Sequence, residues 1–507
     1  MWLLLGQLGC QPHVAPVVST AEQLQGHLVI AHTNDLHAHF EPNRAEWISG
    51  APDIGGFAEI AGHVADLHQT KGEDHVLYLD GGDIMTGTPL MEFEVRGARG
   101  GAMLDFMETA GMDAWVLGNH EFDIGFEHIT SVVNASKIPV LSANLDAKDG
   151  NGEPAIMGLQ DHTIFERNGM KVGVFGLTTD SLARLTASGA AGAMSVRDVV
   201  EVAREQVAAL ESKVDLVVAL THIGLDKDKQ IAESVPGIDL IVGGHSHTAL
   251  TEPVKVAGTW IVQAGCYARQ LGVTEMTIVD GQISTFSAEL RNLEPGSVEV
   301  PADAAALVKT WSERISAHFG AVVGSLEGGD LDRPQQPETP LGRWAADTVR
   351  LAAEADIGVY NPGGLRDDLV EGEITRGALY NVFPFGNDVV QFEVSGADLV
   401  GILLRNASAQ GGGRHPSMQL SGVTAQWRMR AGAPELVDVR VGGARLDHSA
   451  TYTMATNSYI AGQWGYNLGF EPEGVTKVGM TIFEAAVARA GGGVLSPPAD
   501  VRMIQLD

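Results

Sequence analysis

Histidine, aspartate and asparagine residues recur along the first half of the chain in short motifs. Asp35 and His37 alternate in Asn-Asp-Leu-His, and in an extended loop this spacing turns both side chains to the same side. Asp83 follows two glycines, which permit a tight turn and leave its carboxylate free to bridge two ions. Four further donors stand in Gly-Asn-His-Glu, Thr-His-Ile-Gly and Gly-His-Ser-His. The side chains that we expect to hold metal are Asp35, His37, Asp83, Asn119, His222, His245 and His247.

The predicted donors are imidazoles, carboxylates and one amide, without a thiolate. This mixture suits zinc, manganese or iron better than calcium or magnesium, and zinc or manganese is expected. Two divalent cations held close together can activate a shared water and neutralise charge on a phosphoryl group. The set therefore predicts a two-metal hydrolase in which a metal-bridged hydroxide attacks phosphorus and no protein nucleophile is needed.

Each of these motifs directly follows a short run rich in β-branched residues. The runs HLVIAHT, HVLYLD, DAWVLG, VDLVVAL and IDLIVGG are typical of buried strands, and helix-like segments such as SVRDVVEVAREQVAALESK lie between several strand-like runs. Alternation of this kind favours an α/β domain. Open α/β sheets bind ligands at the carboxyl ends of their strands, so we expect the five loops to meet at one edge.

Prolines and a glycine interrupt the alternation around residues 291–301 and divide the chain. We expect an α/β domain over residues 27–295, a linker helix over 296–319 and a smaller α/β or α+β domain over 320–507. Residues 1–26 are expected to be an export signal or a disordered leader. Their apolar start ends in Leu-Gly-Cys and resembles a lipoprotein signal with Cys10 as the lipid anchor, although it lacks the usual basic region.

The composition limits the possible partners. A net charge of −31, from 64 acidic and 33 basic residues, argues against binding of a nucleic-acid duplex. Bound cations can still create an anion site in an acidic protein, so a small phosphorylated substrate remains compatible. No run approaches the roughly 18 apolar residues of a membrane-spanning helix. Cys10 and Cys266 are the two cysteines, and we expect neither a structural disulfide nor a cysteine-rich zinc site.

The order of the motifs resembles that of the calcineurin-like metallophosphoesterases. The longer strings AHTNDLHAHFEP, LDGGDIMTGTP, VLGNHEFDIG and GGHSHT resemble their 5′-nucleotidase family, which includes bacterial UDP-sugar hydrolases. The resemblance implies a sandwich of mixed sheets flanked by helices. It also implies that Asp83 bridges the two metals. One metal would be held by Asp35, His37, Asp83 and His247, and the other by Asp83, Asn119, His222 and His245.

Two residues beside the predicted ligands suggest acid–base chemistry. His120 follows Asn119 directly, and Asp123 can orient its imidazole and favour the protonated form. The resemblance implies that the two form a dyad that stabilises the transition state. The alternative is that Asp123 only caps a helix that begins at Gly125. His39, close behind the first motif, is expected to be a solvated loop histidine.

In the second half, NPGGLR, FPFGN and NSYIAGQWGY resemble the nucleotide-binding region of the family. The resemblance implies that Arg366 contacts phosphate and that Phe385 stacks on the base, with Asn361 and Asn387 lining the pocket. These roles suit the residue types, since a guanidinium binds phosphate in bidentate fashion and every base has a face for stacking. The alternative for Phe385 is a core aromatic residue.

The closing segment departs from the family pattern. Gln463 and Trp464 stand where Gly and Asp are usual, Pro340 replaces a common Asn, and the usual arginine before it is at best displaced to Arg333. The second aromatic ring is expected to be Tyr459, with Trp464 as the alternative. These departures leave the predicted catalysis intact but put the identity of the substrate in doubt.

The combined expectation is hydrolysis of phosphate esters of nucleotides, of the 5′-nucleotidase type, at a periplasmic or cell-surface location. A 2′,3′-cyclic nucleotide phosphodiesterase and a UDP-sugar diphosphatase are alternatives that the sequence does not separate. A non-catalytic nucleotide-binding surface protein is a third. The presence of both a complete ligand set and the pair His120–Asp123 argues against that third alternative, because a binding module needs neither.

Overall fold

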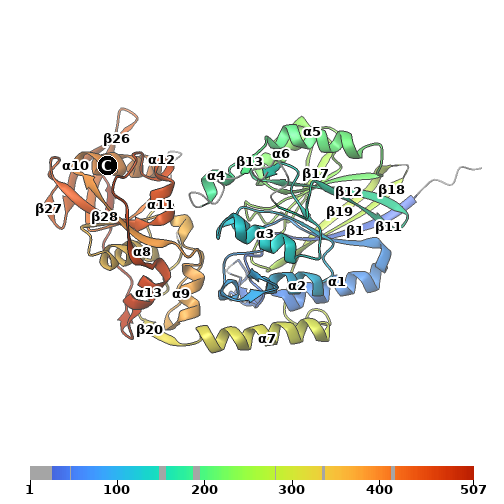
Figure 1. Ribbon diagram of the computed structural model, residues 1–507, viewed down its shortest axis with the longest axis horizontal. Helices are drawn as coiled ribbons and strands as arrows, with labels where there is room; N and C mark the ends of the chain where they lie inside the picture. The colour runs from blue at the N-terminus through green and yellow to red at the C-terminus, as the bar shows by residue number, and fades with distance from the viewer. Residues whose placement is uncertain are drawn as a thin grey trace, which may run out of the picture.

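The computed structural model describes residues 25–45, 47–147, 156–186, 194–279, 281–333, 337–412 and 417–506. Two lobes make up this part of the chain, with helix α7 (Ala302–Phe319) between them in the sequence (Figure 1). The N-terminal lobe contains the elements from β1 to β19, and the C-terminal lobe contains those from β20 onward. Cys10 lies outside the described residues.

Two sheets form the centre of the N-terminal lobe, and each combines parallel and antiparallel pairs. The larger sheet has seven strands, in the order β10 (Leu159–Gln160), β8 (Val140–Leu141), β7 (Ala114–Val116), β4 (Val76–Asp80), β1 (Gln25–Thr33), β18 (Gln270–Val279) and β19 (Gln282–Asn292). The other has six, in the order β11 (His162–Arg167), β12 (Met170–Thr178), β14 (Leu216–His222), β15 (Leu240–Val242), β17 (Thr259–Val262) and β16 (Val254–Val256).

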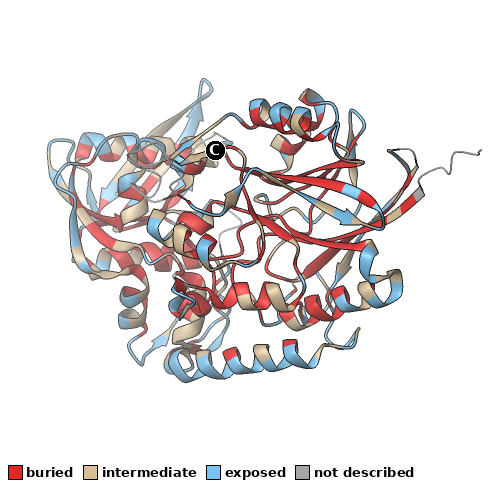
Figure 2. Cartoon of the chain, turned by 45° about the vertical axis from the view of Figure 1, so that its right-hand side comes forward, coloured by how far each residue is buried: buried red, intermediate tan, exposed pale blue. Residues whose placement is uncertain are grey.

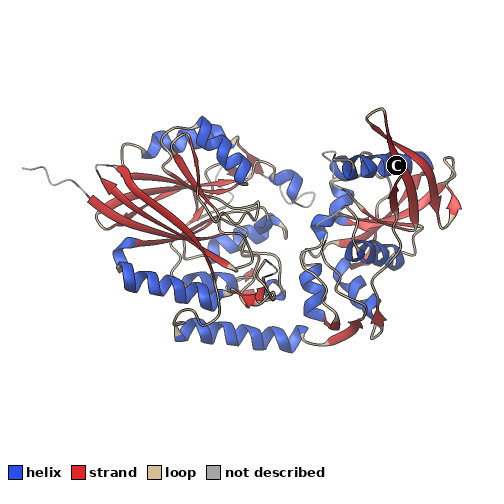
Figure 3. Ribbon diagram, turned by 180° about the vertical axis from the view of Figure 1, so that it is seen from behind, coloured by secondary structure: helices blue, strands red, loops and turns tan. Residues whose placement is uncertain are grey.

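Apolar side chains fill the space between these two sheets, among them the fully buried Leu28, Leu79 and Val218. Helices cover both outer faces (Figure 3). The seven-stranded sheet is covered by α1 (Phe57–Lys71), α2 (Ala102–Thr109) and α3 (Phe126–Ala135), and α7 packs on α1 and α2. The six-stranded sheet is covered by α5 (Val199–Leu210) and α6 (Leu225–Ser234). Figure 2 shows the buried residues along the strands and on the inner sides of the helices.

A five-stranded sheet forms the centre of the C-terminal lobe. Its order is β24 (Gln419–Ser421), β21 (Ile357–Tyr360), β28 (Thr451–Asn457), β23 (Asp388–Ser395) and β29 (Thr476–Thr481). One face packs on α8 (Pro340–Ala352), α9 (Arg376–Val382) and α13 (Ile482–Ala490). The other packs on α10 (Gly396–Gln410), α11 (Ser458–Gly462) and the strand β25 (Val423–Arg430). The predicted architecture, a sandwich of mixed sheets flanked by helices and followed by a second α/β lobe, is confirmed.

Shorter elements complete the two lobes. The strand β20 (Val322–Leu326) follows α7 directly and pairs with β22 (Gly372–Thr375) and β30 (Val494–Leu495). Two short helices face each other across the lobes, α4 (Leu182–Leu185) in the N-terminal lobe and α12 (Trp464–Asn467) in the C-terminal lobe. Within the described ranges, none of the helices combines the length and the apolar character needed to cross a membrane.

Candidate metal centre

The loops after β1, β4, β7, β14 and β15 carry the predicted metal ligands. The first three strands are parallel neighbours in one sheet and the last two are parallel neighbours in the other. Their carboxyl ends can therefore meet at one edge of the sandwich. Backbone hydrogen bonds tie the first two loops together, because the N–H groups of Asp35 and His37 donate to the carbonyls of Gly82 and Asp83 at 2.8 and 2.9 Å.

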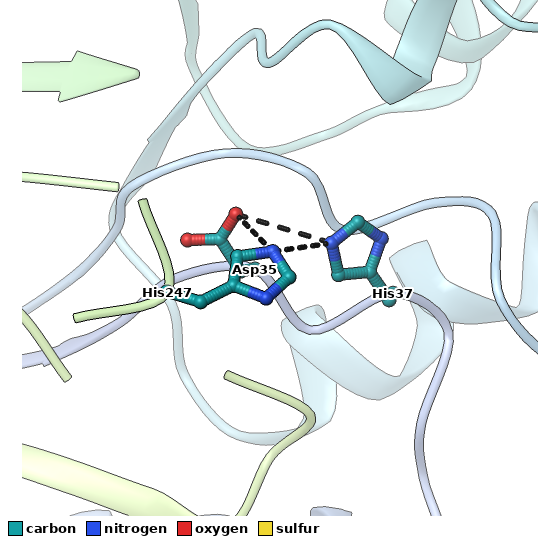
Figure 4. A group of neighbouring side chains, drawn as sticks. All are labelled: Asp35, His37 and His247. Atoms are coloured by element: carbon teal, nitrogen blue, oxygen red, sulfur yellow. Dashed lines mark hydrogen bonds and ion pairs between the residues drawn. The ribbon is translucent and has the colours of Figure 1, made fainter. Parts of the chain in front are cut away.

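One cluster of donors comes from the first and last of these loops (Figure 4). His247 Nε2 lies 3.2 Å from Asp35 Oδ1 and 3.1 Å from His37 Nε2. His37 Nε2 also lies 3.8 Å from Asp83 Oδ2. Three of these side chains, Asp35, His37 and His247, have ligand atoms close enough to hold a single ion.

A second cluster shares Asp83 with the first. His222 Nε2 lies 3.0 Å from Asp83 Oδ2, and His245 completes a group of three whose ligand atoms could hold one ion. Asn119 follows β7 and lines the same cavity as Asp83 and His245. The structure thus brings all seven predicted ligands together, and the carboxylate of Asp83 lies between the two clusters.

Hydrogen bonds to the backbone fix the orientation of two imidazoles. The Nδ1 atom of His37 lies 2.9 Å from the carbonyl of Thr86, and that of His222 lies 2.7 Å from the carbonyl of Gly81. A carbonyl only accepts, so each Nδ1 carries a proton and each Nε2 faces the clusters, where it can bind a metal once it has no proton of its own. That is the tautomer that a metal requires.

Several polar atoms at this edge are buried without a hydrogen-bond partner in the described part of the chain. Asn119 Oδ1 is one of them. Asp35 Oδ1 and His222 Nε2 are also buried without a well-oriented hydrogen bond, and their close polar neighbours are atoms of other predicted ligands, His247 and Asp83. The other oxygen of Asp35 accepts from Asn34 Nδ2 at 2.6 Å and from the N–H of His245 at 2.9 Å. Since unsatisfied buried polar atoms are costly, a shared set of orphaned donor atoms indicates that cations complete them.

The electrostatics of the clusters favour positive charge. Burial alone lowers the pKa of His222, but the carboxylate of Asp83 outweighs burial and raises this pKa to about 10. Burial alone raises the pKa of Asp83, but His222 and then His120 hold it well below its usual range. The carboxylates therefore stay ionised in a buried site, as ligands of divalent cations must.

The ligand loops have an unusual backbone. Five of the predicted ligands have positive φ angles, which are 52° at Asp35, 49° at His37, 56° at Asp83, 76° at His245 and 52° at His247. Residues other than glycine rarely adopt this region, and such strain clusters at functional sites. The surrounding hydrogen bonds must hold these loops in place.

His120 and Asp123 form a close pair beside the clusters. His120 Nδ1 lies 2.7 Å from Asp123 Oδ2, and His120 Nε2 lies 4.0 Å from Asp83 Oδ2. Both side chains line the cavity described below. Helix α3 begins after Gly125 and has no side-chain cap, so the structure does not support the alternative that Asp123 serves as a helix cap.

Glu121 belongs to the same loop and was not assigned a role from the sequence. Its side chain is fully buried, and its carboxylate accepts the N–H groups of Gly118 at 2.6 Å, Met85 at 3.1 Å and Asp83 at 3.2 Å. It therefore joins the loop after β4 to the loop after β7. The sequence offers one signal for this role, an acidic residue directly after Gly-Asn-His and so within a predicted ligand loop.

A cavity of about 250 Å³ opens over the clusters, between the lobes. Arg366 Nη2 reaches across to within 3.2 Å of His37 Nε2. The Phe385 ring is half-buried and stacks on His120 with centroids 5.5 Å apart, so the structure does not support the core alternative for Phe385. The predicted substrate-binding residues all line this cavity: Asn361, Arg366, Phe385, Asn387 and Tyr459.

The structure also separates the two candidates for the second ring. Both rings pack against the core between the sheet and α10, but Tyr459 also lines the cavity and Trp464 does not. Tyr267 was not identified from the sequence. Its ring lies 5.5 Å from those of His37 and His247, and Arg333 Nη1 is 3.4 Å from its hydroxyl.

The prediction that His39 is a solvated loop histidine is wrong. Its side chain is half-buried, and its ring lies 4.5 Å from the ring of Tyr267. Burial, and then the nearby Arg269, lower the pKa of His39 to about 3. His39 is therefore neutral and packs behind the first ligand loop.

Comparisons with known proteins match both lobes. The family profile described as calcineurin-like phosphoesterase matches residues 28–249, and that of the 5′-nucleotidase C-terminal domain matches residues 322–468. Protein UshA of Salmonella pullorum is 30% identical, over 86% of this chain and 85% of that protein. The trifunctional nucleotide phosphoesterase YfkN of Bacillus subtilis is 28% identical over 94% of this chain, which spans only 35% of that protein. The crystal structure of a 5′-nucleotidase precursor from Thermus thermophilus superposes with a TM-score of 0.82 and 26% identity, over 95% of this chain and 99% of that chain.

Proposed function

Because the chain belongs to the 5′-nucleotidase family of calcineurin-like phosphoesterases, we propose that this phosphoesterase hydrolyses nucleoside monophosphates at the centre described above. One observation carries the proposal. A single cavity has metal-ligand donors from the N-terminal lobe on one side and Arg366, Phe385 and Tyr459 from the C-terminal lobe on the other. A phosphate group and an aromatic base of one small molecule would fit these two kinds of surface.

Two divalent cations are part of the proposal, since calcineurin-like phosphoesterases use divalent metals. The mixed nitrogen and oxygen donors fit zinc or manganese. Such ions acidify a bound water and neutralise charge on phosphoryl oxygens. Asp35, His37, Asp83 and His247 would hold one ion, and Asp83, Asn119, His222 and His245 would hold the other.

The remaining side chains of the cavity would act on the substrate directly. Arg366 can bind two phosphoryl oxygens in bidentate fashion, near His37. His120, held by Asp123, can donate a hydrogen bond to a phosphoryl oxygen or a proton to the leaving oxygen. Phe385 and Tyr459 would contact the two faces of the base, and Asn361 and Asn387 would contact its edge or the ribose.

The domain boundaries are part of this proposal. Residues 27–295 would form the catalytic domain, 296–319 the linker helix and 320–507 the substrate-binding domain. Support comes from the last strand of the N-terminal sheets, which ends at Asn292, and from β20, which begins at Val322. The periplasmic or cell-surface location and the lipid on Cys10 stay predictions.

The test is a substrate panel with the purified full chain. It contains nucleoside 5′-monophosphates, 2′,3′-cyclic nucleotides, UDP-sugars and glycerol 3-phosphate, each assayed after chelation and after addition of zinc or manganese. We expect metal-dependent release of phosphate, fastest from nucleoside 5′-monophosphates. Full activity after complete metal removal would overturn the proposed chemistry, and a preference for a cyclic nucleotide or a UDP-sugar would overturn the proposed substrate.

A further inference from the structure

Helix α4 of the N-terminal lobe lies opposite α11 and α12 of the C-terminal lobe (Figure 1). Its first residue, Leu182, is fully buried in the core of the N-terminal lobe and anchors the helix. Its last residue, Leu185, is half-buried and lines the cavity together with Phe385 and Tyr459. The cavity therefore has an apolar wall that comes from the N-terminal lobe.

Side chains of the C-terminal lobe bind the backbone around this wall. A helix leaves its last carbonyls without partners in the helix itself. Gln463 Nε2 donates to the carbonyl of Ala183 at 2.8 Å and to that of Thr186 at 3.0 Å, while the Tyr459 hydroxyl donates to the carbonyl of Arg184 at 3.3 Å. Three hydrogen bonds from the other lobe thus surround Leu185.

The contact depends on the side chain of residue 463. Both hydrogen bonds to α4 and its end come from the Gln463 amide, so a residue without a side-chain donor could not make them. In the structure Gln463 is not among the residues that line the cavity. Its amide contacts α4 instead, so this side chain concerns the position of the wall and not a direct contact to substrate.

We propose that Leu185 is a specificity-determining residue that packs against the leaving group, and that Gln463 is a positioning residue that acts through it. The inference rests on the proposed function and deepens it. The substrates favoured by this wall are monophosphates whose leaving group carries a flat aromatic ring, such as the base of a nucleoside. Esters with a small polar leaving group, such as glycerol 3-phosphate, gain nothing from it.

The readout is the selectivity ratio, the kcat/KM for a nucleoside 5′-monophosphate divided by that for glycerol 3-phosphate. A change that alters kcat/KM equally for both esters, such as weaker metal binding or a shift of one lobe, leaves this ratio unchanged. We expect Leu185→Ala to lower the ratio about tenfold, because a shortened side chain leaves a gap against the leaving group. Leu185→Met, which keeps the apolar volume, should keep the ratio within about twofold.

Gln463→Ala tests the positioning role. Loss of two hydrogen bonds should lower the same ratio about threefold to tenfold. If Gln463 acts through Leu185, the double variant should be no less selective than Leu185→Ala alone, because contacting residues couple in a double-mutant cycle. Thermal melting of each variant, expected to stay close to that of the wild type, shows that the chain remains folded.

The outcomes separate this inference from the proposed function. A wild type that hydrolyses neither ester with zinc or manganese overturns the proposed function, and this inference with it. An active wild type whose selectivity ratio is unchanged by Leu185→Ala overturns the role of Leu185 alone. Additive losses in the double variant overturn the claim that Gln463 acts through Leu185.

Discussion

Replacement of Glu121 by glutamine tests whether the joined ligand loops hold the metals. The carboxylate of Glu121 accepts three backbone N–H groups. Burial, and then the charge of Asp83, raise the pKa of Glu121 to about 8, and a divalent cation bound at Asp83 would lower this pKa and favour the carboxylate. An amide has one accepting oxygen, so at least one N–H would face another donor.

The magnitude follows from these contacts. A hydrogen bond to a charged group contributes about 1.5–3 kcal/mol, and a buried N–H left without a partner costs about 1–3 kcal/mol. We therefore expect Glu121→Gln to lower the free energy of unfolding by about 3 kcal/mol. The substitution would free the backbone of Asp83 and of Gly118 from Glu121. We therefore expect the affinity of the protein for metal to fall about 10- to 100-fold, as it does when other residues that hold metal ligands in place are replaced.

The assay is competition with a chelator of known affinity, followed by kcat at saturating metal. Glu59 offers a control, because it is also buried and one of its oxygens accepts the N–H of Gly296 at 3.1 Å, which belongs to none of the ligand loops. Glu59→Gln should lose stability but keep the metal affinity of the wild type. If both variants lost stability and neither lost affinity for metal, Glu121 would only fill the core and the reasoning would be refuted.

Four further substitutions test other parts of the site and its surroundings. His120→Ala should lower kcat about 10²- to 10⁴-fold with little change in KM, and Asp123→Asn should lower it less; undiminished turnover in steady-state assays would remove the dyad. Phe385→Ala should raise KM for a nucleoside 5′-monophosphate about 10- to 100-fold without a large loss in melting temperature, whereas a core ring would cost about 3–5 kcal/mol of stability. Burial raises the pKa of Asp228 to about 7, so the folded chain binds its proton more tightly than the unfolded chain does, and stability should fall as pH rises from about 4 to 7. Asp228→Asn should remove this pH-dependent part of the free energy of unfolding, which is at most about 4 kcal/mol, in denaturant titrations of the metal-free protein. Identical dependence of stability on pH in the variant and the wild type would contradict this role of Asp228.

The sequence predicted the features that depend on local pattern. Short β-branched runs before Asp35, Asp83 and His222 identified the strands. They also identified the ligand loops, because each ligand stands where such a run ends. The roles of the seven ligands stay predictions, although the structure brings their donor atoms together. The mixed sheets could be expected only through the resemblance, since pairing between β1 and β18 joins segments over 200 residues apart.

Contacts between distant segments could not be read from the sequence. Glu121 differs from any other buried acid only through the N–H groups of the neighbouring loop, which the fold supplies. His39 looked like a polar loop residue, and only the placement of Tyr267 buries it. Likewise, nothing near Gln463 in the sequence indicates that its amide meets α4, some 280 positions earlier.

The covalent path between the lobes lies at one end of their interface. Among the described residues the chain passes from one lobe to the other once, where α7 leads into β20, and Figure 1 shows α4 and α12 well away from that passage. A rotation of one lobe about this passage would move the distant parts of the interface, including α4 and α12, more than the parts near α7. A bulky group on an exposed residue of α7, such as Ala317, should therefore disturb the cavity less than a short cross-link between α4 and α12, which would hold the far ends of the lobes together.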